Sequence, residues 1–232
     1  MRPLRRTPFH PQWLIYSAER FTHNWLRAWA GGRVLDVGCA DGWARDVLAN
    51  CDYIGLDYPV TATSMYRTSP EVFADGKAIP FADGSFDTVL LLEVLEHVRD
   101  PDRVLREIAR VLKPGGQLLL SMPFLYPLHD APHDYRRYTE YGLRHSVAAA
   151  GLAVKELSPR VQGLESAALL TAIACAEAIL SAAHTQRWRL VFAPFFIAAI
   201  PLVNAGGWLC GRLAGKSQML AAGFALVATK PE

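Results

Sequence analysis

One segment of the chain, residues 123–139, combines aromatic and ionisable side chains in a way that suits proton transfer. Histidine ionises near neutral pH, so an imidazole can take the proton from a hydroxyl group as that group reacts. The candidate catalytic residues of this segment are His129, His133, Asp134 and Tyr138, and Arg136 is expected to help orient a substrate.

Two other interpretations of this segment remain open. A metal ion could bind His129 and His133, but two histidines in a proline-broken loop are weak evidence, and we expect no metal site. The segment could also be a lid held together by salt bridges, with no part in the chemistry.

A second group of chemically useful residues surrounds a glycine turn. The turn follows the apolar run 34–37, and Gly38 and Gly42 allow backbone conformations that a side chain would block. Asp57 ends the next apolar run, where its carboxylate can accept both hydroxyls of a ribose. Because ligands of open parallel sheets bind at the carboxyl ends of the strands, these residues predict a nucleoside site.

The turn differs from two common phosphate-binding loops. It has no Lys-Ser or Lys-Thr ending, so it is not a Walker-type loop. It also lacks a full Gly-x-Gly-x-x-Gly, because Ala40 takes the second glycine position, which argues against a nicotinamide-dependent oxidoreductase. The remaining alternative is a turn that merely closes a strand–helix–strand unit.

Short apolar runs alternate with amphipathic stretches, which predicts an α/β fold with a doubly wound, mostly parallel sheet. The expected strands cover residues 34–37, 53–57, 72–74, 86–93, 117–122, 152–157 and 223–230. The expected helices cover residues 11–30, 41–48, 100–112 and 140–150. Glu96 and His97 are expected to be local hydrogen-bonding groups at the start of the third helix.

These residues carry a resemblance to a known family. The motif Asp36-x-Gly38-Cys39-Ala40-Asp41-Gly42, together with Asp57, is similar to the first two motifs of class I S-adenosylmethionine-dependent methyltransferases of the bacterial methyltransferase-11 type. The similarity continues in the family's order through Asp75–Phe81, Ser85–Val89, Glu93–Val98 and Leu112–Gly116. Ala40 is the one departure, since the family often has glycine there.

The resemblance implies a seven-stranded Rossmann-like sheet, whose last strand returns antiparallel between the fifth and sixth, and S-adenosyl-L-methionine as the cofactor. The implied cofactor-binding residues are Asp36, Gly38, Cys39, Ala40, Asp41, Gly42, Asp57, Tyr58, Asp75, Gly76 and Glu93. Among them, Asp57 would hold the ribose, Asp75 the adenine amino group and Glu93 the amino-acid portion.

The segment 123–139 resembles that of bacterial methyltransferases encoded for the modification of cell-surface glycans or lipids. This implies methyl transfer to a small, lipid-linked or glycan-linked acceptor by O-methylation, with positioning of donor and acceptor as the main requirement. A non-catalytic scaffold that binds S-adenosylmethionine is the alternative.

An unusually apolar insertion precedes the last strand. Residues 190–211 contain no charged side chain, and residues 164–183 contain only Glu165 and Glu177. Such a run can span a bilayer, but a single crossing would keep the last strand from rejoining the sheet. We expect a helical insertion over 160–217 that dips into one leaflet, caps the substrate site or forms a dimer interface.

Size and charge favour a single domain over residues 1–232, with an arm and a helix over 1–30. A net charge of +2 gives no basis for nucleic-acid binding. The four cysteines show no disulfide-like spacing and no signal-peptide pattern is visible, so we expect a cytoplasmic protein. Peripheral contact with the inner face of the membrane is left open.

Overall fold

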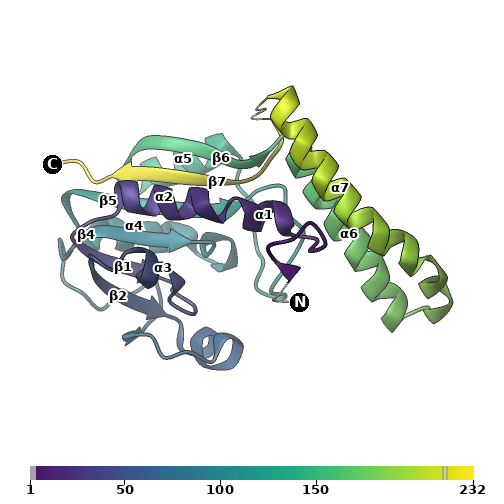
Figure 1. The fold of residues 1–232 in the computed structure, drawn as a ribbon. Helices are drawn as coiled ribbons and strands as arrows, with labels where there is room; N and C mark the ends of the chain where they lie inside the picture. The colour runs from purple at the N-terminus through teal and green to yellow at the C-terminus, as the bar shows by residue number, and fades with distance from the viewer. Residues whose placement is uncertain (1–3, 216, 218) are drawn as a thin grey trace. The chain divides into compact units, whose positions relative to one another are not determined.

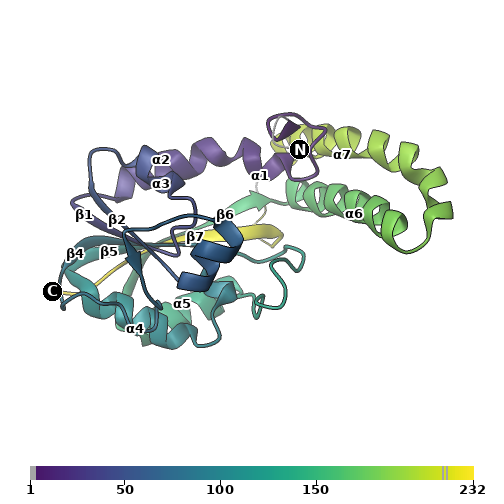
Figure 2. The same cartoon turned by 90° about the horizontal axis from the view of Figure 1, so that it is seen from below.

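The computed structural model describes residues 4–215, 217 and 219–232, and its central element is a seven-stranded sheet with helices on both faces (Figures 1 and 2). The strands are β1 (Arg33–Val37), β2 (Asp52–Asp57), β3 (Val72–Phe73), β4 (Phe86–Leu92), β5 (Leu112–Pro123), β6 (Ala153–Gln162) and β7 (Ala221–Thr229). The α-helices are α1 (Trp13–Ser17), α2 (Glu19–Trp29), α3 (Trp43–Val47), α4 (Pro101–Val111), α5 (Glu140–Ala149), α6 (Leu164–His184) and α7 (Ala193–Ala214). Residues 1–3 of the expected arm and residue 216 of the expected insertion lie outside the described residues.

The strand order is β3-β2-β1-β4-β5-β7-β6, which confirms the doubly wound α/β prediction. β1 pairs in parallel with β2 on one side and β4 on the other, so the order reverses beside β1. Ligands of such sheets bind in the crevice at that reversal. The last strand lies between the fifth and sixth, as the resemblance implied.

β7 runs opposite to β5. Near one end of the pair, Lys230 exchanges backbone hydrogen bonds with Gly115 and Gly116. Near the other end, the Leu125 N–H donates to the carbonyl of Ala221, so residue numbers rise on one strand while they fall on the other. That is the pattern of an antiparallel pair.

The core forms because the central strands are apolar on both faces. On one face, Trp25 and Leu26 of α2 pack with Val34, Leu90 and Leu119 of the sheet. The buried side chains of α4 recur at helical spacing and comprise Val104, Leu105, Ile108 and Val111. Its first turn is closed by Asp100, whose carboxylate accepts the N–H of Arg103, and Pro101 fits the first helical position.

Several expected boundaries differ. α3 begins at Trp43 rather than at 41, because Gly42 has a left-handed φ of +71°. The stretch 11–30 is two helices rather than one, because the Ala18 N–H bonds to Ile15 three residues back and its ψ of 0° leaves the helical path. β5 begins at Leu112 rather than at 117, because Leu112 pairs with Phe86 of β4 and the glycines at 115 and 116 pair with Lys230. β6 extends to Gln162, five residues beyond the expected strand end at 157.

The chain divides into two compact units. The larger comprises His23–Phe124, Leu128–Ser158 and Phe224–Glu232, and the smaller comprises Met1–Thr22, Leu125–Pro127 and Pro159–Gly223. In the smaller unit, α6 and α7 pack side by side, and the buried Asn204 of α7 donates to the carbonyls of Pro8 and His10. These two hydrogen bonds hold the N-terminal arm against α7.

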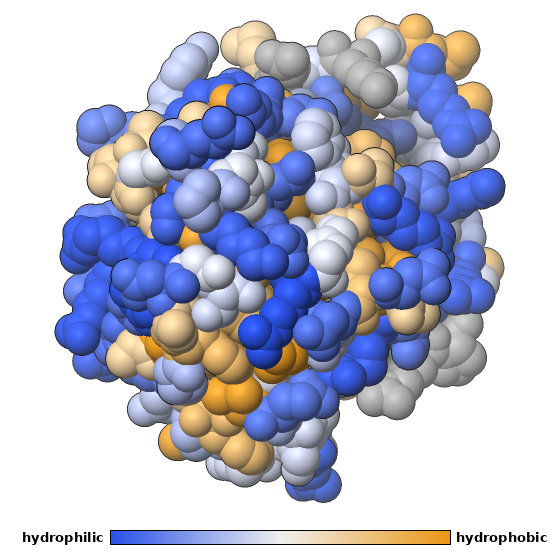
Figure 3. All heavy atoms as spheres, turned by 90° about the vertical axis from the view of Figure 1, so that its left-hand side faces the viewer, coloured by the Kyte–Doolittle hydropathy of each residue, from blue (hydrophilic) through white to orange (hydrophobic). Residues whose placement is uncertain are grey.

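α6 and the stretch that includes α7 are long and apolar enough to cross a membrane, judged by length and composition alone. The face of the molecule in Figure 3 is mostly hydrophilic, with hydrophobic residues only in separate patches. By contrast, the exposed side chains around α7 are largely apolar and include Trp188, Val191, Phe195, Leu202 and Leu213.

Asp36 lies in the middle of the larger unit's core rather than at its surface. The residue is 3% exposed, and its carboxylate accepts a hydrogen bond from the Tyr53 hydroxyl. Burial raises the pKa of Asp36 to about 7. The Tyr53 hydrogen bond lowers this pKa, and the negative charge of Asp57 raises it further. An unfolded aspartate ionises near pH 4, so between pH 4 and 7 the folded state holds a proton that the unfolded state has lost.

We predict that Asp36→Asn removes part of the pH dependence of stability. The free energy of unfolding of the wild type should fall as pH rises through 5 to 7, because ionised Asp36 is desolvated only in the folded state. Relative to wild type, the variant should gain on the order of 3 kcal/mol between pH 5 and pH 8 in urea titrations. Asp52→Asn, at the exposed start of β2, serves as the control, and a difference that stays constant with pH would contradict the prediction.

Candidate functional site

A cavity of about 450 Å³ opens at the carboxyl ends of β1, β2 and β4 within the larger unit. Its wall includes Gly38 after β1, Asp57 at the end of β2, and Glu93 after β4. The loop after β5 contributes His133 and Tyr135. Residues from both predicted groups therefore line one cavity.

Asp57 is a buried acceptor with a fixed orientation. The residue is 4% exposed, and its two carboxylate oxygens accept the backbone N–H groups of Ala40 at 2.9 Å and Tyr58 at 2.7 Å. Burial raises its pKa, while these two hydrogen bonds oppose the rise. Each carboxylate oxygen keeps further acceptor capacity, so Asp57 can bind two donors in the cavity.

The turn between β1 and α3 needs small residues. Gly38 has φ of +79°, and a Cβ built there would lie 2.4 Å from a methyl carbon of Val94. Ala40 adopts φ of +49°, a left-handed conformation that costs an alanine roughly 1 kcal/mol more than a glycine. The turn thus keeps a glycine-like backbone at Ala40, which leaves its N–H directed at Asp57.

Three further predicted residues also line the cavity. Asp75 follows β3 and accepts the Lys77 N–H at 2.9 Å, with the Lys77 ammonium 3.3 Å from its other oxygen. Gly76 lies beside it, and a Cβ there would press on Val37 at 3.3 Å. Tyr58, next to Asp57, completes this set.

The remaining predicted cofactor residues do not line the cavity. They are Asp36, Cys39, Ala40, Asp41 and Gly42. The Asp36 carboxylate is engaged by Tyr53 in the core, and the buried Cys39 thiol packs against Gly55. Ala40 contributes through its backbone, because its N–H holds Asp57.

The loop after β5 is bound to the segment that follows β4. The Tyr135 N–H donates to the carbonyl of Glu96 at 2.9 Å, and the Arg136 guanidinium donates to the carbonyl of Arg99 at 2.8 Å. Arg99 in turn donates to the Tyr135 hydroxyl at 2.9 Å. These bonds bring His133 and Tyr135 to the cavity, with the His133 Nδ1 3.1 Å from the Tyr135 oxygen.

His129, Asp134 and Tyr138, which were predicted to be catalytic, do not line the cavity. The Asp134 carboxylate is held by both terminal nitrogens of Arg137 and by the His129 N–H. The Arg137 hydrogen bonds lower the pKa of Asp134 to about 2, so it is a weak base at neutral pH. In this structure Asp134 organises the loop.

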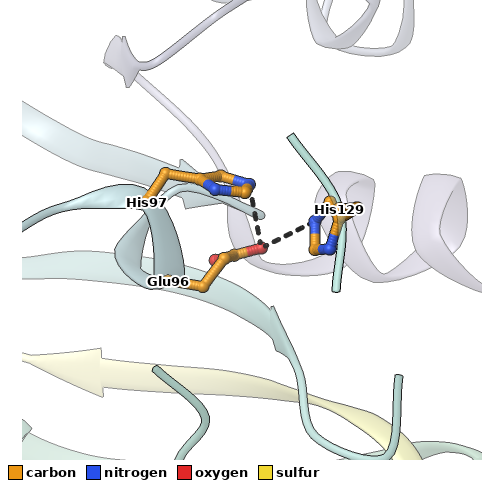
Figure 4. Close-up of side chains that lie close together, drawn as sticks. All are labelled: Glu96, His97 and His129. Carbon is orange, nitrogen blue, oxygen red and sulfur yellow. Dashed lines mark ion pairs between the residues drawn. The ribbon is translucent and has the colours of Figure 1, made fainter. Parts of the chain in front are cut away.

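Glu96 and His97, on a short 3₁₀ turn (Leu95–His97), meet His129 of the loop (Figure 4). The Nε2 atoms of His97 and His129 lie 3.7 and 4.0 Å from the same Glu96 oxygen. The sequence prediction for Glu96 was wrong, because its carboxylate accepts no hydrogen bond from the described residues. The position of Glu96-His97 shortly after a strand end was a sequence signal for a functional role. The contact of Glu96 with His129 could not be predicted, because the two residues are far apart in the sequence.

The sequence reasoning also missed Tyr135 and Asp130 as cavity residues. Both belong to the loop that follows β5. The hydrogen bonds between this loop and the segment from β4 to α4 determine which of its side chains line the cavity.

Comparisons with known proteins agree with this geometry. A family model described as a methyltransferase domain matches residues 35–120. A ubiquinone biosynthesis O-methyltransferase of Pseudomonas aeruginosa is 35% identical over an alignment of 186 residues. The alignment covers 66% of this chain and 78% of that protein. A demethylmenaquinone methyltransferase of Renibacterium salmoninarum is 33% identical over 158 residues, 62% of this chain and 65% of that protein.

The fold is also found in solved structures. Phosphoethanolamine N-methyltransferase 2 of Haemonchus contortus, solved in complex with S-adenosyl-L-methionine, superposes with a TM-score of 0.55. It covers 99% of this chain and 59% of its own, at 16% identity, and therefore supports the fold alone. The sequence relatives carry the assignment further: the chain belongs to the class I S-adenosylmethionine-dependent methyltransferases and is an enzyme that uses this cofactor.

Proposed function

We propose that the chain transfers the methyl group of S-adenosylmethionine to a hydroxyl oxygen of a small, lipid-linked acceptor. The observation that carries this proposal is that the strand-end acids and the His133–Tyr135 pair line the same cavity. The names of the relatives, which concern quinone biosynthesis, agree with an acceptor of this chemical type.

On the donor side, Asp57 accepts the two ribose hydroxyls, because its oxygens are oriented by backbone N–H groups and face the cavity. Asp75 and Gly76 contact the adenine, and Glu93 faces the amino-acid portion. When bound, the cofactor supplies an electrophilic methyl group on a sulfonium. The chain's task is to hold this group in line with the acceptor, which is chiefly an effect of positioning.

On the acceptor side, His133 is the best-placed base in the cavity. With its proton on Nδ1 and directed at the Tyr135 oxygen, its Nε2 keeps a lone pair that can accept the hydroxyl proton. Arg99, which donates to the same Tyr135 oxygen, fixes that hydroxyl in place. His129 and Asp134 stabilise the loop away from the cavity through the hydrogen bond between them. Tyr138 does not line the cavity, and we give it no role toward the acceptor.

A lipid-linked acceptor is favoured over a glycan by the apolar helices. The stretch around α7 exposes Trp188, Val191 and Phe195, and the basic side chains of Arg187, Arg189 and Arg212 occur at its ends. Exposed aromatic and aliphatic groups flanked by arginines favour binding at the surface of an anionic membrane. We propose that α6 and α7 contact the cytoplasmic membrane surface, where a lipid-linked acceptor resides.

We predict that Asp57→Asn weakens the binding of S-adenosylmethionine about 100-fold. The variant exchanges a charged acceptor for a neutral one, and hydrogen bonds to charged groups contribute about 1.5–3 kcal/mol each. Isothermal titration calorimetry measures the affinity. Asp52→Asn, at the other end of β2, should bind like wild type, and equal affinities for both variants would remove Asp57 from the ribose site.

We predict that His133→Ala lowers turnover 10²- to 10³-fold while the affinity for S-adenosylmethionine changes less than threefold. A panel of prenyl-chain phenols and catechols, assayed with a radiolabelled methyl donor, identifies the acceptor class and the methylated atom. The exposed His145→Ala on α5 is the control. Unchanged turnover of His133→Ala would exclude it as the base, and products methylated only on carbon or nitrogen would exclude O-methylation.

We predict that the full chain sediments with vesicles containing phosphatidylglycerol. Replacing Val191 and Phe195 together by Asp should lower the vesicle-bound fraction at least tenfold, because burial of one such side chain contributes about 1.5–3 kcal/mol. Tyr141→Asp, which alters an 81% exposed residue of α5, should not change binding. Equal sedimentation of all three proteins would contradict membrane contact through this stretch.

A further inference from the structure

Glu96 is a buried carboxylate that lacks the partners such a group normally has. Its side chain is 0% exposed, and neither carboxylate oxygen accepts a hydrogen bond from the part of the chain that the structure describes. Burial, together with the nearby charge of Glu93, raises the pKa of Glu96 to about 9. Buried carboxylates are expected to be protonated, to be paired or to bind a cation.

Two imidazole rings meet this carboxylate. The Nε2 atoms of His97 and His129 lie 3.7 and 4.0 Å from the Glu96 Oε1, and the two rings are 4.9 Å apart between centroids (Figure 4). One ligand atom from each of the three residues lies within 4.8 Å of the other two. The distances from Nε2 to Oε1 are too long for hydrogen bonds but lie within ion-pair range.

The opposite nitrogen of each ring also has polar neighbours. The His97 Nδ1 lies 3.0 Å from the carbonyl oxygen of His133. The His129 Nδ1 lies 3.3 Å from the Asp134 carboxylate and 3.4 Å from a terminal nitrogen of Arg137. The carbonyl acceptor places the ring proton of His97 on Nδ1, so the His97 Nε2 directs a lone pair toward Glu96.

Acceptor atoms that face one another repel unless a proton or a metal cation lies between them. A histidine ligand that donates its other ring N–H to a carbonyl or a carboxylate is the usual arrangement around protein-bound metal ions. His97 has this arrangement, and the Nδ1 of His129 lies 3.3 Å from the Asp134 carboxylate.

We propose that Glu96, His97 and His129 bind a divalent transition-metal cation. Two imidazoles and one carboxylate are a donor set for Zn²⁺ and its neighbours, whereas Mg²⁺ and Ca²⁺ prefer oxygen ligands alone. Atoms bonded to one tetrahedral ion at about 2.1 Å lie about 3.4 Å apart, so the side chains must move closer together on binding.

The ion would face the substrate cavity. His97 and Asp130 both line that cavity, and an Asp130 oxygen lies 3.9 Å from the His97 Nε2. An acceptor hydroxyl bound at an open position of the ion would lose its proton more readily. This last consequence rests on the proposed O-methylation, whereas the cation site itself does not.

The test measures cation binding in the absence of any acceptor. The full chain, stripped with EDTA and dialysed, is titrated with Zn²⁺, Co²⁺ and Mg²⁺ by calorimetry, and Co²⁺ binding is also followed by visible absorption. We expect one Zn²⁺ or Co²⁺ per chain, at least 100-fold tighter than Mg²⁺. His129→Ala and Glu96→Gln should each lower the Zn²⁺ affinity at least 100-fold, and the exposed His145→Ala should leave it unchanged.

Binding of S-adenosylmethionine to each variant verifies that it folds, since neither His129 nor Glu96 lines the cavity. Zn²⁺ affinity that His129→Ala leaves within twofold of wild type, or equal affinities for Zn²⁺ and Mg²⁺, would overturn the proposal. So would the absence of binding to wild type. In that case Glu96 is a protonated buried acid, and the acceptor assays above still decide the proposed function separately.

Discussion

Burial of carboxylates at the carboxyl edge of the parallel sheet is the constraint on which the site depends. Asp57 keeps a hydrogen-bonded carboxylate there, because two backbone N–H groups replace the water that it loses. Asp36 has one hydroxyl donor and a pKa raised to about 7. Glu96 has no donor among the described residues. The environments of the three acids therefore differ: Asp57 is an oriented acceptor, Asp36 belongs to the core, and Glu96 is the carboxylate for which we propose a bound cation.

The sequence predicted the features that depend on short-range chemistry. Apolar runs, the glycine turn and the strand-end acids identified the sheet, and they placed Gly38, Asp57, Asp75 and Glu93 on the cavity wall. These predictions succeeded because a parallel strand that ends at a glycine turn has few alternative structures.

The sequence could not predict which side chains meet across loops. Glu96 and His129 are 33 positions apart, and the bond from Tyr135 to the Glu96 carbonyl is what brings their segments together. Asp134 looked like a base, but Arg137, three positions later, binds its carboxylate. Side-chain direction in a proline-containing loop has no periodicity to reveal it.

The relatives inform donor and acceptor unequally. The methyltransferase-domain match ends at residue 120, before the loop that carries His133 and before α6 and α7. The family-model match therefore covers the strand-end acids Asp57, Asp75 and Glu93 of the cavity. His133 and Tyr135, which also line the cavity, lie outside the segment that the family model matches.

The position of β7 has a consequence for biosynthesis. β7 lies between β5 and β6, yet it follows α6 and α7 in the chain. A ribosome therefore releases two long apolar helices while β5 and β6 still lack the strand that joins them. During that interval the nascent chain presents open sheet edges and hydrophobic helices together, a combination that invites aggregation. Early capture of the helices by a chaperone or a lipid surface would protect the chain until the sheet can close.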